Sequence, residues 1–132
     1  NTEAEFRYGA ADETSNYEAS IDMSSGKHFI RTSIGGSSNG ESKLQNIQHG
    51  INLTDSLTSR VGYFYETPGI GIDYKISDKL GLSLSTYDIG NTKVDIYANY
   101  EVLNDVDLLY GIRNNVDNNK LNTIDMGTKF KF

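Results

Sequence analysis

The side chains that most often carry enzyme chemistry are few in this chain and are not grouped. The 132 residues include two histidines and no cysteine, which excludes disulfides, thiolate metal sites and cysteine nucleophiles. His28 and His49 fall on different predicted strands, and no Asp or Glu stands at a metal-ligand spacing around either. We interpret both as wall or rim residues, and we predict no metal site, no cofactor and no enzymatic activity.

Three weaker patterns also lack the context that their chemistry needs. The serines form no Gly-x-Ser-x-Gly elbow. The Pro-Gly-Ile-Gly run at residues 68–71 is not followed by the helix of a phosphate-binding loop. Residues 105–107 and 115–119 are rich in Asp and Asn but lack the turn glycine and distal glutamate of a calcium loop. We read all three as strand entries, turns and loops.

Composition restricts the partners and the possible membrane spans. The formal charge of −6 and the pI of about 4.8 argue against nucleic acid, because phosphate binding needs a basic surface. No apolar run approaches the ~20 residues of a membrane-spanning helix. Any span must therefore be a β-strand. The length predicts a single domain over residues 1–132. Because the chain opens directly on a strand-like segment without a signal peptide, we expect it to be excised from a longer protein.

Alternation with a period of two runs through the whole chain and predicts an all-β fold. The strand-like segments are long enough for tilted strands of ~9–11 residues to cross a hydrocarbon layer, whereas sandwich strands are usually nearer ~5–6. We predict a single antiparallel up-and-down transmembrane barrel of about ten strands. The expected strands are residues 2–11, 16–24, 28–36, 44–53, 57–66, 69–77, 80–90, 93–103, 106–115 and 122–132.

The connections alternate between short and long. Short turns are expected at residues 24–27, 54–56, 77–79 and 104–105, and longer links at 12–15, 37–43, 67–68, 90–92 and 115–121. Short turns on one rim and longer loops on the other, with an even number of strands, are typical of bacterial outer-membrane barrels. We therefore expect an outer-membrane protein with its short turns and both termini on the periplasmic rim.

Each predicted strand has an apolar face and a charged face. In the last strand, Ile124, Met126, Phe130 and Phe132 share the apolar parity and are predicted to face lipid, with the terminal Phe acting as the signal read by the outer-membrane assembly machinery. The opposite parity predicts a charge network in the lumen, formed by Glu5, Arg7, Glu18, Arg31, Arg60, Asp73, Lys75, Asp95, Arg113, Asp125 and Lys129. Intermixed acids and bases favour a salt-bridged plug over an open pore.

Energetics favour placing the charged face inside. An Arg or Lys facing lipid near the bilayer midplane costs roughly 2–4 kcal/mol. Glycines such as Gly71 and Gly111 fall on the charged parity, as a narrow concave wall requires. A soluble barrel with its apolar face inward, enclosing an apolar ligand, remains the alternative at this stage.

From about residue 57 to its end, the chain resembles the C-terminal β-barrel region of long MCE (MlaD-type) lipid-transport proteins of diderm bacteria. The residues that carry the resemblance are Arg60-Val61-Gly62, residues 68–74, Lys79-Leu80-Gly81-Leu82-Ser83, Tyr87-Asp88, Tyr100, residues 109–113 and the closing residues 127–132. In the first half of the chain, the resemblance is limited to the regular spacing of the predicted strands. The MCE domain itself is absent from this sequence.

The resemblance implies a barrel that anchors a trans-envelope phospholipid-transport protein in the outer membrane. Its implied partners are outer-membrane lipids, an upstream MCE and periplasmic helical region, an inner-membrane ABC-type complex and the outer-membrane assembly machinery. Three other functions stay open: a small stand-alone outer-membrane barrel of the porin or adhesin kind, a soluble lipid-carrier barrel and, last, an outer-membrane enzyme.

Overall fold

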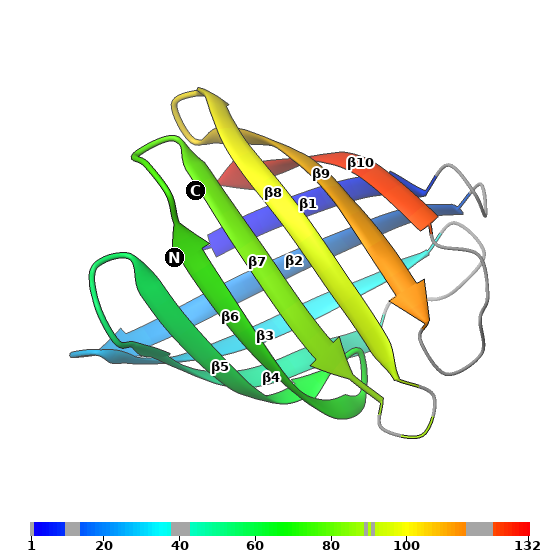
Figure 1. The fold of residues 1–132 in the computed structure, drawn as a ribbon, viewed down its shortest axis with the longest axis horizontal. Helices are drawn as coiled ribbons and strands as arrows, with labels where there is room; N and C mark the ends of the chain where they lie inside the picture. The colour runs from blue at the N-terminus through cyan, green and yellow to red at the C-terminus, as the bar shows by residue number, and fades with distance from the viewer. Residues whose placement is uncertain (1, 10–13, 38–42, 89, 91, 116–122) are drawn as a thin grey trace.

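Ten antiparallel strands form a closed barrel in the computed structural model, which describes residues 2–9, 14–37, 43–88, 90, 92–115 and 123–132 (Figure 1). The strands are β1 (Thr2–Gly9), β2 (Thr14–Ser25), β3 (His28–Ser37), β4 (Lys43–Asn52), β5 (Leu57–Phe64), β6 (Thr67–Lys75), β7 (Leu80–Tyr87), β8 (Lys93–Leu103), β9 (Val106–Asn115) and β10 (Thr123–Lys131). Each pairs with its neighbours along the chain. The predicted fold, an all-β up-and-down barrel of ten antiparallel strands, is confirmed.

The first and last strands close the barrel. Pairing of β1 with β10 runs from Glu3 opposite Lys131 to Gly9 opposite Asp125. Beyond it, the Phe132 N–H donates to the Thr2 carbonyl at 2.8 Å. The described sheet thus has no free edge. In the described part of the chain, no helix has the length and apolar character needed to cross a membrane.

Short connections join β2–β3, β4–β5, β6–β7 and β8–β9 at one end of the barrel, which we call the turn rim; the opposite end is the loop rim. Both termini lie at the turn rim (Figure 1). One of the loop-rim links was predicted at residues 67–68, and this position was wrong. The link is the two-residue turn Tyr65-Glu66, with φ of 50° and 73°, and Pro68 lies inside β6 opposite Tyr63. A two-residue turn of this kind needs positive φ at both residues, and Asn or Gly in the sequence usually indicates it. Tyr and Glu give no such indication.

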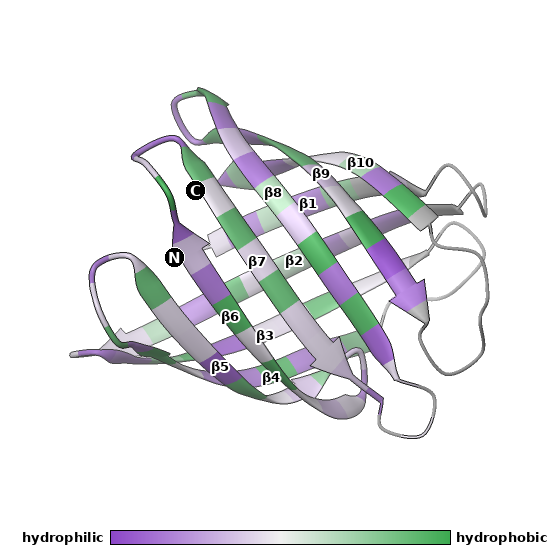
Figure 2. Ribbon diagram, viewed as in Figure 1, coloured by the Kyte–Doolittle hydropathy of each residue, from purple (hydrophilic) through white to green (hydrophobic). Residues whose placement is uncertain are grey.

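Apolar side chains cover the outside of the wall, and polar side chains point inward, as the parity predicted. Figure 2 shows the alternation along each strand. On the outer face the exposed apolar side chains include Phe6, Tyr8, Tyr17, Ile21, Ile30, Ile47, Val61, Tyr63, Ile70, Ile72, Leu82, Leu84, Ile96, Tyr100, Leu108, Tyr110, Ile112, Ile124 and Met126. Most of the buried side chains are polar or charged instead. The polarity is thus the reverse of that in a water-soluble barrel.

Inward glycines make room for the long polar side chains of the lumen. A Cβ added at Gly71 would lie 2.6 Å from the Arg60 Nη2 atom, and one at Gly111 would overlap the Tyr97 ring. Because real Cβ atoms do not approach so closely, these two positions must lack a side chain so that Arg60 and Tyr97 can extend into the lumen. This explains why the glycines fall on the charged parity.

Candidate functional site: the charged lumen

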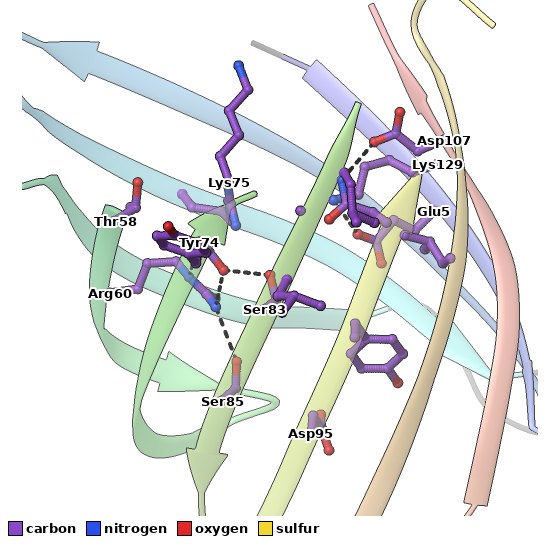
Figure 3. A pocket seen from close by; sticks show the side chains of 18 of the residues that line it. Glu5, Thr58, Arg60, Tyr74, Lys75, Ser83, Ser85, Asp95, Asp107 and Lys129 are labelled. Carbon is purple, nitrogen blue, oxygen red and sulfur yellow. Dashed lines mark hydrogen bonds and ion pairs between the residues drawn. The ribbon is translucent and has the colours of Figure 1, made fainter. Parts of the chain in front are cut away.

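The barrel encloses a polar cavity of about 480 Å³ (Figure 3). Its lining includes Asp55, Ser56 and Lys79 from the turns at the turn rim, and it extends inward to Tyr65 and Asp95. The cavity is therefore a vestibule that begins at the turn rim. Its walls are built by inward side chains from strands all around the barrel.

Arg60 organises the middle of the lumen. Its Nε lies 2.8 Å from Asp73 Oδ2, and its Nη2 donates to Asp73 Oδ1 at 2.9 Å. Nη1 donates to Gln48 at 2.9 Å. Nη2 also reaches Ser85 at 3.2 Å (Figure 3). Ser83 donates to the same carboxylate at 2.6 Å. A buried guanidinium is tolerated in this position because each of its three nitrogens lies within 3.2 Å of a side-chain oxygen.

Two lysines of β10 pair with acids from both neighbouring sides. Lys129 Nζ lies 3.2 Å from a Glu5 oxygen and 3.6 Å from a Glu3 oxygen, both on β1. Lys131 Nζ lies 3.1 Å from Asp107 on β9 and 3.6 Å from Glu101 on β8. These contacts link the last strand to both sides of the closure through charge as well as through backbone hydrogen bonds.

A third pair lies on β2 and β3. Arg31 binds Asp22 with two hydrogen bonds, Nε to Oδ1 at 2.8 Å and Nη2 to Oδ2 at 2.9 Å. Its guanidinium carbon lies 5.5 Å from the centre of the buried Phe29 ring, at a distance suited to a cation–π contact. The fork geometry fixes both side chains against one wall.

Toward the loop rim, Asp125 and its donors point into the lumen. Arg113 approaches this carboxylate with Nε at 2.6 Å and Nη2 at 3.1 Å, and the Tyr97 hydroxyl also donates to it. Asp125 is 1% exposed. A charge so deeply buried is stable only because three donors from β8 and β9 converge on it.

An aromatic plug, consisting of Phe64, Tyr65 and Tyr87, lies beside this group. Phe64 is 1% exposed, and the Tyr87 ring lies 6.3 Å from the Phe64 ring and 5.2 Å from the Tyr65 ring. The Tyr87 hydroxyl donates to Asp95 at 2.9 Å. The plug and the Arg113–Asp125 pair both lie inside the barrel, toward the loop rim.

The turn that carries Tyr65 is attached to β4. The backbone N–H of Tyr65 donates to the Asn46 side chain at 3.0 Å, and the N–H of Glu66 donates to the Gln45 carbonyl at 2.9 Å. An irregularity in the pairing of β3 with β4 places an extra residue at this point. Asn46 also donates to Ser33 at 2.7 Å and to Glu18 at 3.2 Å. The turn is thereby fixed against the wall.

The structure brings most of the predicted lumen charges into contact with partners. Glu5 meets Lys129, Arg60 meets Asp73, and Arg113 meets Asp125, whereas Arg31 pairs with Asp22, Glu18 with Asn46 and Asp95 with Tyr87. Lys75 lies half-exposed at the mouth, 4.0 Å from Asp78. The side chain of Arg7 lies outside the described residues, as do the candidate calcium loop residues 116–119.

Sequence reasoning missed the uncharged members of the site. Asn46, Phe64, Tyr87 and Tyr97 all point inward, and only their parity within each strand could have identified Tyr97 and Tyr87 beforehand. The last-strand residues predicted to face lipid have exposed or ring-packed side chains. Phe130 contacts the Phe6 ring edge-on at 6.2 Å, and Ile124, Met126 and Phe132 are exposed.

Acids outnumber bases among the described inward side chains. The acids include Glu3, Glu5, Glu18, Asp22, Asp73, Asp88, Asp95, Glu101, Asp107 and Asp125, and the bases include Arg31, Arg60, Lys75, Lys93, Arg113, Lys129 and Lys131. A lumen of this sign attracts cations. No cluster of three or more metal-binding side chains occurs within the described ranges.

The sequence matches one family model. Residues 5–132 fit a model described as a lipocalin-like domain. No curated protein matches the chain.

Several solved structures share the barrel. The KdgM porin in complex with disordered oligogalacturonate superposes with a TM-score of 0.63 at 13% identity, covering 98% of this chain and 99% of the porin. A structure titled EF1p2_mFAP2b bound to DFHBI gives 0.60 at 8% identity, over 100% and 92% of the two chains. A barrel from work titled "De novo design of transmembrane beta-barrels" gives 0.52 at 15% identity, over 99% and 92%. At these identities the similarity shows the fold alone.

Proposed function

Since this chain belongs to the lipocalin-like domain family and yet turns its apolar side chains outward, we propose that it is a small stand-alone outer-membrane β-barrel of the porin kind, with its lumen closed in the state described. The observation that carries the proposal is the reversed polarity of the wall. An apolar exterior matches a bilayer, and a lumen lined by paired charges matches water and polar solutes.

The same observation argues against the soluble lipid carrier. A carrier of that kind holds an apolar ligand in its interior. Here the centre of the cavity is occupied by Arg60, Asp73 and Gln48, whose hydrogen bonds would be lost to an acyl chain. The exposed outer face would also present apolar area to water that soluble monomers rarely tolerate.

In the proposed porin, the vestibule admits small polar solutes from the turn rim and the aromatic plug controls passage to the loop rim. The excess of lumen acids favours cations. The KdgM porin is in complex with oligogalacturonate, an anionic sugar, so we expect this chain to prefer a solute of the opposite charge.

Conductance in planar bilayers tests this function. The wild-type barrel should give little current, and the Phe64→Ala/Tyr87→Ala variant should give larger, cation-preferring steps because it removes two of the three rings of the plug. Tyr63→Ala is the matched control, since Tyr63 precedes Phe64 on the same strand but faces outward. Heat-modifiable migration on gels verifies that each variant is folded. A folded plug variant that conducts no more current than the wild type would contradict the porin proposal.

One observation favours a second function, the MCE-type membrane anchor. A barrel closed by ion pairs and aromatic rings suits an anchor, which needs no conducting lumen. The turn rim also holds both ends of the described chain, which suits an upstream MCE region on the periplasmic side. In a full-length protein, deleting this barrel should release the upstream part from the outer-membrane fraction. If the upstream part stayed in that fraction, the anchor function would be excluded.

A further inference from the structure

Two histidines from neighbouring strands meet on the outer wall, away from the lumen. His28 is the first residue of β3, and His49 lies on β4. The His28 Nδ1 and His49 Nε2 atoms are 3.0 Å apart. The ring centres are 5.2 Å apart and the ring planes lie within 4° of parallel. The rings therefore approach through their nitrogens, one donating and the other accepting.

The surroundings of the pair are apolar on one side and open to the turn rim on the other. His28 stands opposite Ile51, and His49 stands opposite Ile30 and Val61. Lys27, in the turn just before His28, is the charged residue nearest to the pair in the chain. Both rings are exposed, so a ligand can reach them from the aqueous boundary of the wall without entering the barrel.

We propose that His28 and His49 form a binding site for one divalent transition-metal ion at the turn rim. Imidazole nitrogen is a preferred ligand of Zn²⁺, Cu²⁺ and Ni²⁺. Two such nitrogens bound to one ion at ~2.0–2.1 Å with a tetrahedral angle lie about 3.3 Å apart. The observed 3.0 Å needs only a small separation of the nitrogens and a turn of the two exposed rings.

The backbone holds the ligands in place before the metal arrives. Each histidine belongs to a paired strand, and the Ile30–His49 and His28–Ile51 pairings fix the offset between the two Cα atoms. Little main-chain entropy is therefore lost on binding. Water completes the coordination sphere from the rim side. On binding, the ring that donates the hydrogen bond carries its hydrogen on its other nitrogen, so that both facing nitrogens present a lone pair to the ion.

Binding of Cu²⁺ and of Zn²⁺ to the barrel in detergent, made without a histidine tag, tests the site. Wild-type protein should take up one equivalent of either metal. His28→Asn and His49→Asn should each weaken uptake at least about tenfold, and the double variant should abolish it. Electron paramagnetic resonance of the Cu²⁺ form should show coupling to two imidazole nitrogens. Thr32→Asn, an outward change on the same strand, is the control and should bind like wild type.

Two results would overturn the site. One is uptake by the double variant equal to that of wild type, which would assign binding to the carboxylates of the lumen. The other is an absence of uptake by folded wild-type protein, which would leave the pair as a hydrogen bond between two wall residues. Neither result bears on the conductance experiment, because the pair lies outside the lumen.

Discussion

At the scale of single residues, the lumen is stable because each buried charge finds several partners. Asp125 accepts from Arg113 and Tyr97, and Asp73 accepts from Arg60 and Ser83. Isolated charges in such positions would cost several kcal/mol each. The number of donors per carboxylate, more than the number of ion pairs, determines whether this lumen can exist.

Asp125→Asn should destabilise the folded barrel by about 3 kcal/mol, because it removes the carboxylate charge that the Arg113 Nε and Nη2 atoms approach inside the wall. The measurement is the urea midpoint of unfolding in detergent. Asp55→Asn, in an exposed turn, is the control and should change stability by less than about 0.5 kcal/mol. Equal effects of the two substitutions would contradict the structural role of the Asp125 carboxylate.

At the scale of elements, β10 joins the two ends of the chain and carries residues for both faces. Lys129 and Lys131 point inward to acids, while Met126 and Phe130 point outward. Phe132 is 81% exposed, so it contributes little to packing in the described structure. Its predicted use as an assembly signal is therefore separable from stability.

Phe132→Ala should lower the amount of barrel assembled in the outer membrane several-fold while leaving the urea midpoint of the purified, folded protein nearly unchanged. The two readouts should differ because the predicted signal would depend on the exposed Phe132 ring, which contributes little to the packing of the fold. Met126→Ala, also outward on β10 but remote from the end, is the matched control for assembly. Wild-type levels of assembled Phe132→Ala would exclude the signal.

The β5–β6 turn shows where sequence reasoning reached its limit. Strand number, the face of each side chain and the inward glycines followed from alternation, which is local. The inward position of Tyr65 could not be predicted from alternation. Its N–H donates to Asn46, 19 residues earlier, at an irregularity in strand pairing that no local sequence pattern indicates. Ion-pair partners such as Arg31 with Asp22 likewise depend on the register between strands, which composition does not fix.

At the scale of the whole molecule, the outer wall is a band of aliphatic side chains with aromatic side chains near its borders. Tyr8 and Tyr63 lie near the loop rim, and Tyr74 and Phe132 near the turn rim. Tyrosine and other aromatic rings favour the two interfaces of a bilayer. The distribution predicts an orientation in which the barrel axis runs along the membrane normal.

Ile72→Arg should destabilise the barrel in lipid vesicles by about 2–4 kcal/mol, because Ile72 is exposed near the middle of β6, opposite Leu84 of β7. Leu103→Arg, at the exposed end of β8, should cost at most about 1 kcal/mol. Guanidinium unfolding from vesicles measures both. If the barrel were a water-soluble protein, Arg at either exposed position would be nearly neutral, and the two variants would not differ.

The closure between β1 and β10 also has a consequence for the order of folding. Nine of the ten strand pairings join neighbours along the chain, whereas Glu3 and Lys131 are brought together from opposite ends. Hairpins close quickly over short loops, but this last pairing bears the loop entropy of the entire sequence. The barrel should therefore form hairpin by hairpin as an open sheet. Pairing of β1 with β10 should be the final and slowest step.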